Sequence, residues 1–363
     1  DLVVVGAGIS GLAAAFFYRQ RRPGARILVL DNHDDFGGHA KRNEFVLDGR
    51  LLLSYGGSES LQSPKGLYSA VAKGLLRDLG IDIKRFETAF ERNLYPSLGL
   101  SRGVFFPREH FGRDALVTGD PTAMVADDIG PALSNAKPVR EFVSGFPLSE
   151  AGKAKVIALY EGKDDPLAGK TVSEKQDFLE ATSYRDYLIK QCGCSEAVAN
   201  CFHGRSLDFM ALASDLISAA SAREIGLPGF AALGLPQEPS PERDEPYIYH
   251  FPDGNASLAR LLVRALIRGS ANGRGMDDIV LARMRYDTLD RPGQNVRIRL
   301  DSTCVQVRNG GKAAEAVYLR AGKPYRVEAK HVVLACFNMA IPYMMPELAE
   351  AQRNALLRNV KAP

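Results

Sequence analysis

Residues 1–31, DLVVVGAGISGLAAAFFYRQRRPGARILVLD, decide the fold of this chain. The apolar run Leu2–Val5 leads into a glycine-rich turn, and a helix-forming stretch, Leu12–Arg19, follows the turn. A second apolar run, Arg26–Leu30, ends at an acidic residue. The order strand, glycine turn, helix and strand within about thirty residues is typical of a βαβ unit. It predicts an α/β, Rossmann-like fold with a parallel sheet and a right-handed crossover.

The glycine turn has the spacing that a bound dinucleotide requires. Gly6 permits the tight turn, Gly8 lets the backbone approach a pyrophosphate, and Gly11 lets the helix pack closely on the strand. The phosphates then lie at the helix N-terminus, where unpaired N–H groups favour negative charge. Asp31 is placed to accept both ribose hydroxyls, and its charge disfavours the 2′-phosphate of NADP. The first predicted cofactor contacts are Gly6, Gly8, Ile9, Ser10, Gly11 and Asp31.

A glycine turn in an unrelated α/β protein is the alternative interpretation. A bare G-x-G-x-x-G pattern would leave that alternative open, but here the strand, helix, second strand and terminal acid are all in register. The fingerprint alone does not separate FAD from NAD.

The composition is that of an ordinary globular protein, with 363 residues, 45% hydrophobic and 25% charged, and a net charge of +3. Acidic and basic residues alternate without a dense basic run, so nucleic acid is not an expected partner. No apolar stretch reaches the roughly 18 residues of a membrane-spanning helix, so none is expected. The five cysteines are too few and scattered for a disulfide framework.

The segment after Asp31, Asn32-His33-Asp34-Asp35-Phe36-Gly37-Gly38-His39, resembles the flavin-containing amine oxidase superfamily. In that family an acid at the end of the second strand is followed, after five residues, by a Gly-Gly pair that lies against the FAD pyrophosphate. The resemblance therefore implies FAD, with Asn32 and the pair Gly37-Gly38 among its contacts. The family usually has arginine after the pair, whereas this chain has His39, with Lys41 and Arg42 close behind. Which of the three meets a phosphate stays open.

The resemblance continues at Gly56-Gly57-Ser58, which matches the family's second glycine pair near the flavin ring. Residues 65–86 are expected to form a helix and a strand. Downstream, Asn255 is expected to cap the helix Ala256–Ile267. Strands are expected at residues 296–300, 303–307, 316–319, 325–328 and 332–336. The strand at 303–307 implies main-chain contacts to adenine, with Cys304 at that position.

Within the superfamily the likeness is greatest to the bacterial spermidine dehydrogenases, through the strings DNHDDFGGHAKRNEF at 31–45 and SLGLSRGVFF at 97–106 and through residues 244–267. This likeness implies FAD-dependent oxidation of a polyamine, with electrons passed to an acceptor other than oxygen. It also implies haem, which would be non-covalent because no C-x-x-C-H motif is present. The compartment stays open between bacterial cytoplasm and periplasm.

Three segments are expected from this reasoning: a first half of the FAD-binding domain at 1–86, an inserted substrate or cap region at 87–245, and a second half of the FAD-binding domain at 246–363. Helical patterns such as 151–161, 183–191 and 207–224 predict that the insertion is largely helical. Because family members continue with further strands and a last flavin-binding turn, the second half is expected to be truncated and the chain to be a fragment.

Two residues are candidates for the substrate pocket, although the catalytic residues stay unknown. Glu59 follows the second glycine turn and could pair with a distal ammonium group; the alternative is an acid at a helix start. His203 could be a haem ligand or line the pocket; the favoured alternative is a histidine that caps the end of a helix. Cys192, Cys194 and Cys201 with His203 resemble metal-ligand spacing, but packed free thiols are the favoured interpretation and no metal is expected.

Two other functions compete with amine oxidation. A carotenoid-type flavoprotein desaturase would share the N-terminal fingerprint and line its pocket with apolar side chains. A domain that binds FAD only as a structural or electron-carrying element would share it too. Reduction of the flavin by an amine separates both from the amine hypothesis.

Overall fold

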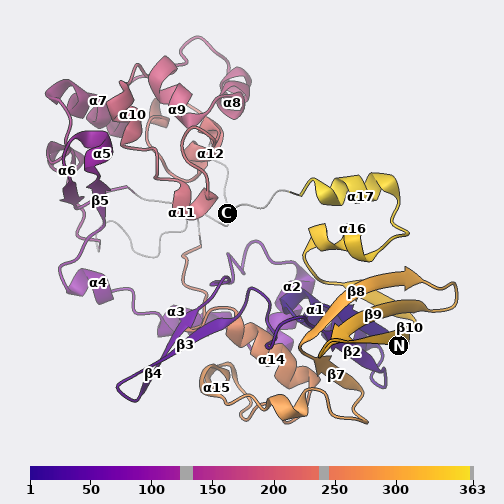
Figure 1. Cartoon of the computed structure of the whole chain (residues 1–363). Helices are drawn as coiled ribbons and strands as arrows, with labels where there is room; N and C mark the ends of the chain where they lie inside the picture. Colours follow the sequence, from indigo (N-terminus) through magenta and orange to yellow (C-terminus); the bar gives the residue numbers. More distant parts are fainter. Residues whose placement is uncertain (123–133, 237–244, 360–363) are drawn as a thin grey trace. The chain divides into compact units, whose positions relative to one another are not determined.

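The computed structural model describes residues 1–122, 134–236 and 245–359 (Figure 1). The chain divides into two compact units. Unit 1 comprises Asp1–Pro64, Tyr68–Thr88 and Ile248–Lys361, and unit 2 comprises Lys65–Leu67 and Ala89–Tyr247. Unit 1 therefore combines residues from the first quarter of the chain with residues from its last third.

Unit 1 is built on a four-stranded sheet with the strand order β11-β1-β2-β7. All neighbouring strands are parallel, and Leu2 aligns with both Ile27 and His331. The two central strands are wholly apolar, LVVV and ILVL, which suits strands covered on both faces. The strands are β1 (Leu2–Val5), β2 (Ile27–Leu30), β7 (Val296–Arg299) and β11 (His331–Leu334). The predicted Rossmann-like α/β fold is confirmed.

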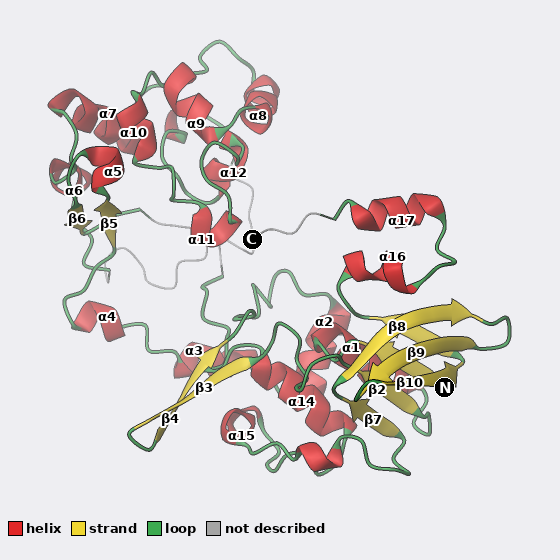
Figure 2. Ribbon diagram, viewed as in Figure 1, coloured by secondary structure: helices red, strands yellow, loops and turns green. Residues whose placement is uncertain are grey.

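Helices cover one face of this sheet (Figure 2). Helix α1 (Ile9–Arg21) packs there so closely that a Cβ at Gly11 would lie 3.1 Å from a Val4 methyl. Helix α14 (Ala256–Leu266) lies beside α1, and Arg19 of α1 donates hydrogen bonds of 2.7 and 2.8 Å to the carbonyl oxygens of Ala265 and Leu266. A cation on the last carbonyls of α14 satisfies groups that the helix leaves unpaired.

A second, antiparallel sheet packs on the other face, in the order β10-β9-β8. Its strands are β8 (Ser302–Asn309), β9 (Ala314–Arg320) and β10 (Lys323–Ala329). Because side chains alternate along a strand, Val3 and Val5 point away from the Val4 face and share a core with Val307 and Tyr318. The parallel sheet is thereby buried on both faces.

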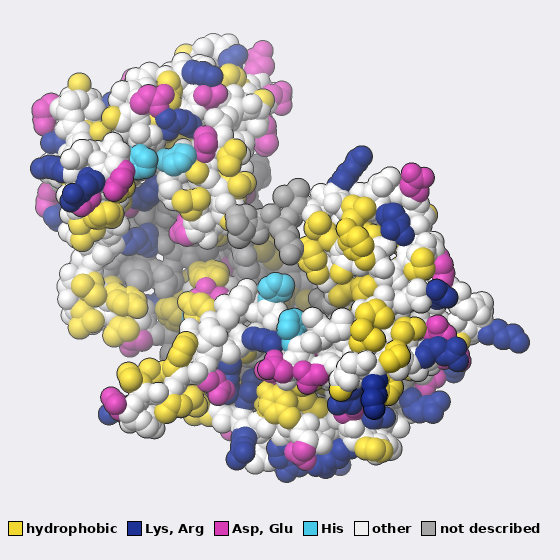
Figure 3. All heavy atoms as spheres, in the orientation of Figure 1, with side chains coloured by type: hydrophobic (Ala, Val, Ile, Leu, Met, Phe, Trp, Pro, Cys, Tyr) yellow, Lys and Arg dark blue, Asp and Glu magenta, His cyan; other side chains and the backbone are white. Residues whose placement is uncertain are grey.

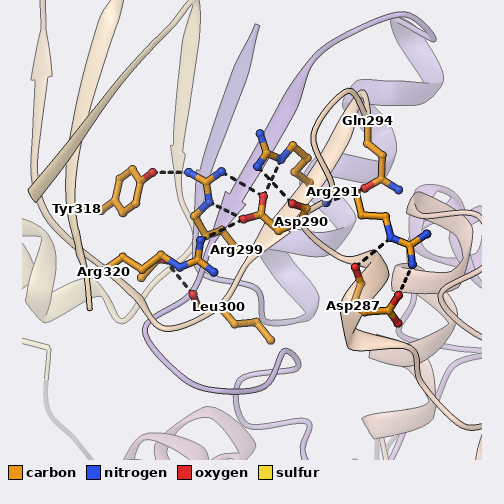
Figure 4. A network of polar contacts seen from close by, with 10 residues as sticks. Asp287, Asp290, Arg291, Gln294, Arg299, Leu300, Tyr318 and Arg320 are labelled. Carbon is orange, nitrogen blue, oxygen red and sulfur yellow. Dashed lines mark hydrogen bonds and ion pairs between the residues drawn. The ribbon is translucent and has the colours of Figure 1, made fainter. Parts of the chain in front are cut away.

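A charged cluster ties the two sheets together (Figure 4). Asp290 accepts hydrogen bonds from Arg297 Nε at 2.6 Å and Arg299 Nε at 2.8 Å, and it also forms an ion pair with Arg320 of β9. Arg299 in turn donates to the Tyr318 hydroxyl. The main-chain oxygen of Arg299 accepts the Asp31 N–H at 3.0 Å, so the cluster also fixes the strand beside the end of β2.

The remaining elements of unit 1 surround this core. They are the hairpin β3 (Arg42–Leu47) and β4 (Arg50–Tyr55), α2 (Ala70–Asp78), α3 (Ile83–Ala89), α15 (Met276–Leu281), α16 (Ile341–Met344) and α17 (Glu350–Leu357), with single 3₁₀ turns at Tyr286–Thr288 and Asn338–Ala340. The hairpin turns at Asp48-Gly49 and exposes apolar side chains (Figure 3), among them Phe45, Val46 and Leu51.

Unit 2 is largely helical, with one small hairpin. Its elements are α4 (Leu94–Ser97), β5 (Gly103–Phe106), α5 (Arg108–Phe111), β6 (Ala115–Thr118), α6 (Val139–Ser144), α7 (Glu150–Glu161), α8 (Val172–Ala181), α9 (Tyr184–Asp186), a π turn (Tyr187–Gln191), α10 (Glu196–Asn200), α11 (Leu207–Met210), α12 (Ala219–Glu224) and a 3₁₀ turn (Ala231–Leu233). Side-chain caps start many of these helices; Thr171 and Glu174 form a full capping box on α8. Tyr184 and Tyr187 are buried at the centre of its core.

Two local predictions are wrong. Residues 79–86 contain no strand, because the chain passes from α2 through a Gly80 turn into α3. The segment 207–224 is two short helices rather than one, since Ala211 has a φ of +55°, which ends α11 in a left-handed conformation. Among the described residues, no helix is long and apolar enough to cross a membrane.

Candidate dinucleotide-binding site

Two of the three fingerprint glycines are required by the packing of the protein itself. Gly6 has a φ of +109°, and a Cβ there would lie 2.3 Å from the Ala335 oxygen of the loop after β11. A Cβ at Gly11 would lie 1.9 Å from the Gly6 oxygen. No side chain fits at either distance, so these glycines close the strand-to-helix turn.

Gly8 differs from them. Its φ of −70° suits any residue, and a Cβ there would come no closer than 3.8 Å to another atom, the Gly37 oxygen. Gly8 is the N-cap of α1, which has no side-chain cap and no acidic residue in its first turn, where Ile9, Ser10 and Gly11 lie. The backbone of this turn is therefore accessible and electropositive. It fits a pyrophosphate, and nothing in the protein's packing explains the glycine.

The structure brings the pair Gly37-Gly38 against this turn. The Gly37 N–H donates to the Ala7 oxygen at 2.8 Å, and Gly8 and Gly37 form an isolated parallel bridge. Both glycines have positive φ, +109° and +60°, and a Cβ on Gly38 would lie 3.3 Å from the Gly8 Cα. Two backbone segments without side chains thus meet at the start of α1.

Asp31 is 6% exposed, and its carboxylate already accepts hydrogen bonds from the protein. Ala7 N–H donates to Oδ2 at 2.7 Å. On Oδ1, the His33 N–H donates at 2.9 Å and His33 Nδ1 lies at 3.1 Å. Asn32 is exposed beside it. The ribose role of Asp31 stays a prediction, but the sequence reasoning missed that the same carboxylate holds the glycine turn.

The substitution Asp31→Ala is expected to have two effects. It should weaken FAD binding by about 2 kcal/mol through loss of charged hydrogen bonds to the ribose, and it should lower stability because the buried Ala7 N–H loses its acceptor. Titration of FAD followed by flavin fluorescence, together with urea denaturation of the cofactor-free chain, separates the two. Asp31→Asn keeps one acceptor and should recover stability better than affinity.

The three candidate phosphate contacts after the glycine pair, His39, Lys41 and Arg42, have different surroundings. Arg42 is 12% exposed and is committed to Asp253 at 3.1 Å, to Glu44 at 2.6 Å and to the Val280 oxygen. It is therefore not available for a phosphate. His39 is exposed, and Lys41 is one-third exposed with Asp34 3.6 Å away. Of the three residues that could contact a phosphate, His39 and Lys41 therefore remain candidates.

The second glycine turn lies against the residues that follow the first pair, and against the start of α14. The Gly56 N–H donates to the Lys41 oxygen at 2.9 Å, and a Cβ on Gly57 would lie 3.5 Å from the His39 oxygen. The prediction that Asn255 caps α14 is right in position and wrong in chemistry, because its side chain makes no cap bond. Instead, Asn255 Nδ2 donates to Ser58 Oγ and the Ser60 oxygen, both at 2.9 Å.

The other amide atom, Asn255 Oδ1, is buried without a hydrogen-bond partner among the described residues. A buried acceptor left unpaired beside Ser58 is costly unless a ligand or water supplies a donor. This atom is a second feature, after the open Gly8 turn, that fits a polar cofactor at this place.

Two further predicted residues, Cys304 and Glu59, also belong to unit 1. Cys304 is half-buried on β8, at a bulge, and β8 begins beside Asp31 because the Ser302 N–H donates to the Asp31 oxygen at 2.7 Å. Glu59 lies in the loop between β4 and α2 of unit 1, so the alternative of a helix-start acid is wrong. Its role in a pocket stays a prediction.

His203 belongs to unit 2 and does not cap a helix with its side chain. Its Nδ1 lies 3.3 Å from Ser214 Oγ and 3.9 Å from Asp215 Oδ1, and the imidazole is 47% exposed. The favoured helix-capping interpretation is therefore wrong, and its role in a pocket stays a prediction. Cys194 and Cys201 are buried free thiols, and burial raises the pKa of each to about 12.

Within residues 1–122, 134–236 and 245–359, no group of three or more His, Cys, Asp or Glu side chains could hold a metal ion. The described contacts of His203, with Ser214 and Asp215, do not support the haem that the resemblance implies.

The fold and the glycine turn define a Rossmann-like domain. A family model described as NAD(P)-binding Rossmann-like domain matches residues 4–79. No curated protein matches the sequence.

Solved structures of two kinds of oxidase align with this chain. A candidate protoporphyrinogen oxidase from Exiguobacterium sp. 255-15 aligns with a TM-score of 0.52 at 16% identity, over 97% of this chain and 63% of that chain. An engineered putrescine oxidase aligns with a TM-score of 0.45 at 18% identity, over 98% and 62%, and the putrescine-bound wild type with 0.41 at 17%, over 98% and 63%. The chain spans less than two thirds of the length of these proteins. A likeness to spermidine dehydrogenases in particular stays a prediction.

Proposed function

We propose that this chain is the FAD-binding part of a flavoprotein oxidoreductase that oxidises an amine. The observation that carries the proposal is the open backbone at Gly8, with Gly37 and Gly38 meeting it. A dinucleotide pyrophosphate needs a close approach to the backbone at a helix N-terminus, and the turn at Gly8, with Gly37 and Gly38 beside it, offers backbone without side chains there. FAD is favoured over NAD because the glycine pair and the second turn at Gly56 follow the pattern of the flavin amine oxidases.

Different residues of the site would bind the phosphates and the ribose of the cofactor. The first N–H groups of α1, from Ile9 and Ser10, would hold the phosphates, and Asp31 would bind the ribose. Lys41 would supply positive charge, and His39 a hydrogen bond, to a phosphate. FAD, when bound, provides the acceptor for a hydride equivalent from the carbon next to an amine nitrogen. The protein contributes orientation and exclusion of water.

The substrate class that we propose is a polyamine such as spermidine, with the electrons passed to an acceptor other than oxygen. The extended likeness of residues 31–45 and 244–267 to spermidine dehydrogenases supports this class. A polyamine carries distal ammonium groups that need carboxylate partners, and Glu59 lies directly after the second glycine turn. We propose Glu59 as such a partner.

Anaerobic mixing tests this reaction. The FAD-loaded protein that contains this chain is combined with spermidine, putrescine or a hydrophobic monoamine while the oxidised flavin band is followed. We expect rapid bleaching that is fastest with spermidine. Bleaching by an apolar polyene instead would assign a desaturase, and a flavin that no substrate of either kind bleaches would support the electron-carrying or structural alternative.

The substitution Glu59→Gln is expected to raise the spermidine concentration needed for half-maximal bleaching by about tenfold, with a smaller effect at saturation. A carboxylate that pairs with a distal ammonium contributes mainly uniform binding, which does not change the chemical step. Asp48→Asn, an exposed acid at the tip of the β3–β4 hairpin, is the matched control and should change neither value. Equal losses in the two variants would contradict the role of Glu59.

A further inference from the structure

The Asp31 carboxylate is held by two backbone N–H groups and by one imidazole nitrogen. Its Oδ1 faces both the N–H of His33, at 2.9 Å, and the imidazole Nδ1 of the same residue, at 3.1 Å. A carboxylate can only accept, so this contact requires the proton on Nδ1. Oδ2 is held separately by the Ala7 N–H at 2.7 Å. Both oxygens are thereby fixed in position. Oδ1 uses both of its lone pairs on the two donors of His33, whereas Oδ2 keeps one lone pair for a ligand hydroxyl.

The residue that supplies two of these donors is itself anchored. The His33 oxygen accepts the Asp301 N–H at 2.8 Å, and the Asp31 oxygen accepts the Ser302 N–H at 2.7 Å. Two N–H groups at the turn between β7 and β8 therefore hydrogen-bond to the main chain on both sides of Asn32. The imidazole starts from a fixed backbone, although 56% of its side-chain surface is exposed.

We propose that His33 is a positioning residue, which fixes the Asp31 carboxylate in the orientation that binds the adenosine ribose. This inference rests on the proposed function only in that a dinucleotide must bind at Gly8. With only the backbone N–H of His33 on Oδ1, the carboxylate would keep more orientational freedom to lose on binding, and the imidazole contact reduces that freedom beforehand.

Three substitutions separate the side-chain donor from the backbone donor, which all of them keep. His33→Ala removes the imidazole, and FAD binding should weaken about three- to tenfold, as for one charge-assisted hydrogen bond at a half-exposed site. His33→Asn places an amide N–H near the position of Nδ1 and should recover most of the affinity. His33→Gln carries its amide further out, near the position of Nε2, and should not. Flavin fluorescence measures the dissociation constants, and circular dichroism checks that each variant is folded.

A double-mutant cycle with Asp31→Ala completes the test. If His33 acts through Asp31, His33→Ala should change FAD affinity less than twofold in the Asp31→Ala background. The same loss in both backgrounds, or no recovery with His33→Asn, would overturn the positioning role.

NAD⁺ serves as a second probe. A wild-type chain that binds NAD⁺ and not FAD overturns the proposed cofactor, while a loss of NAD⁺ affinity in His33→Ala would still support the positioning role. Binding of neither dinucleotide overturns both.

Discussion

The substitution Gly8→Val is expected to abolish FAD binding while the chain stays folded. The φ of −70° at Gly8 is open to any residue, and a Cβ there meets nothing closer than 3.8 Å. A branched side chain at the N-cap of α1 should therefore cost no more than about 1 kcal/mol of stability. It would occupy the space into which the pyrophosphate must come to reach the helix N-terminus. Gly8→Ala should give a weaker form of the same result.

Gly11→Ala is the matched control for this experiment. The added methyl would lie 1.9 Å from the Gly6 oxygen, inside the βαβ unit, so the variant should fold poorly before any ligand is present. Circular dichroism and the visible spectrum of the purified protein distinguish the two variants. A Gly8→Val protein that is yellow and binds FAD as tightly as the wild type would show that the cofactor does not lie on this turn.

The substitution Asp253→Ala is expected to lower the free energy of unfolding by about 3–5 kcal/mol. Asp253 is fully buried, and its carboxylate joins Arg42 of the β3–β4 hairpin at 3.1 Å to Ser257 of α14 at 2.7 Å. Arg42 is only 12% exposed, so removal of the carboxylate leaves a largely buried cation that keeps only the half-exposed Glu44 as an acidic partner. The pair costs desolvation to form, but loss of one member is far more costly than absence of both.

The urea midpoint of the cofactor-free chain measures this loss. Asp287→Ala is the control, because Asp287 forms an ion pair with Arg291 in which both side chains are more than half exposed. Its removal should cost less than about 1 kcal/mol. Similar midpoints for the two variants would mean that the buried pair does not hold the hairpin to α14.

Much of the cofactor-binding half could be predicted from short stretches of sequence. The strands at Leu2–Val5 and near Ile27–Leu30 and the helix between them follow from local hydrophobicity and glycine spacing, which act over a few residues. The start of α14 was also placed correctly at Ala256. The local pattern is misleading at 207–224, where helical periodicity continues across Ala211, although the left-handed conformation of that residue ends the first helix.

The βαβ unit, with the parallel pair β1 and β2, and the glycine spacing that a dinucleotide requires depend on residues close together in the chain, so a sequence pattern predicts them. The pairing of this unit with β7 and β11, and the partners of the side chains around it, depend on contacts that form only when the chain folds. Arg42 is committed to Asp253, and Asn255 turns from its helix to Ser58. These partners are about two hundred residues apart in sequence, and a polar side chain takes whichever partner folding brings within hydrogen-bond distance. No local pattern records that choice.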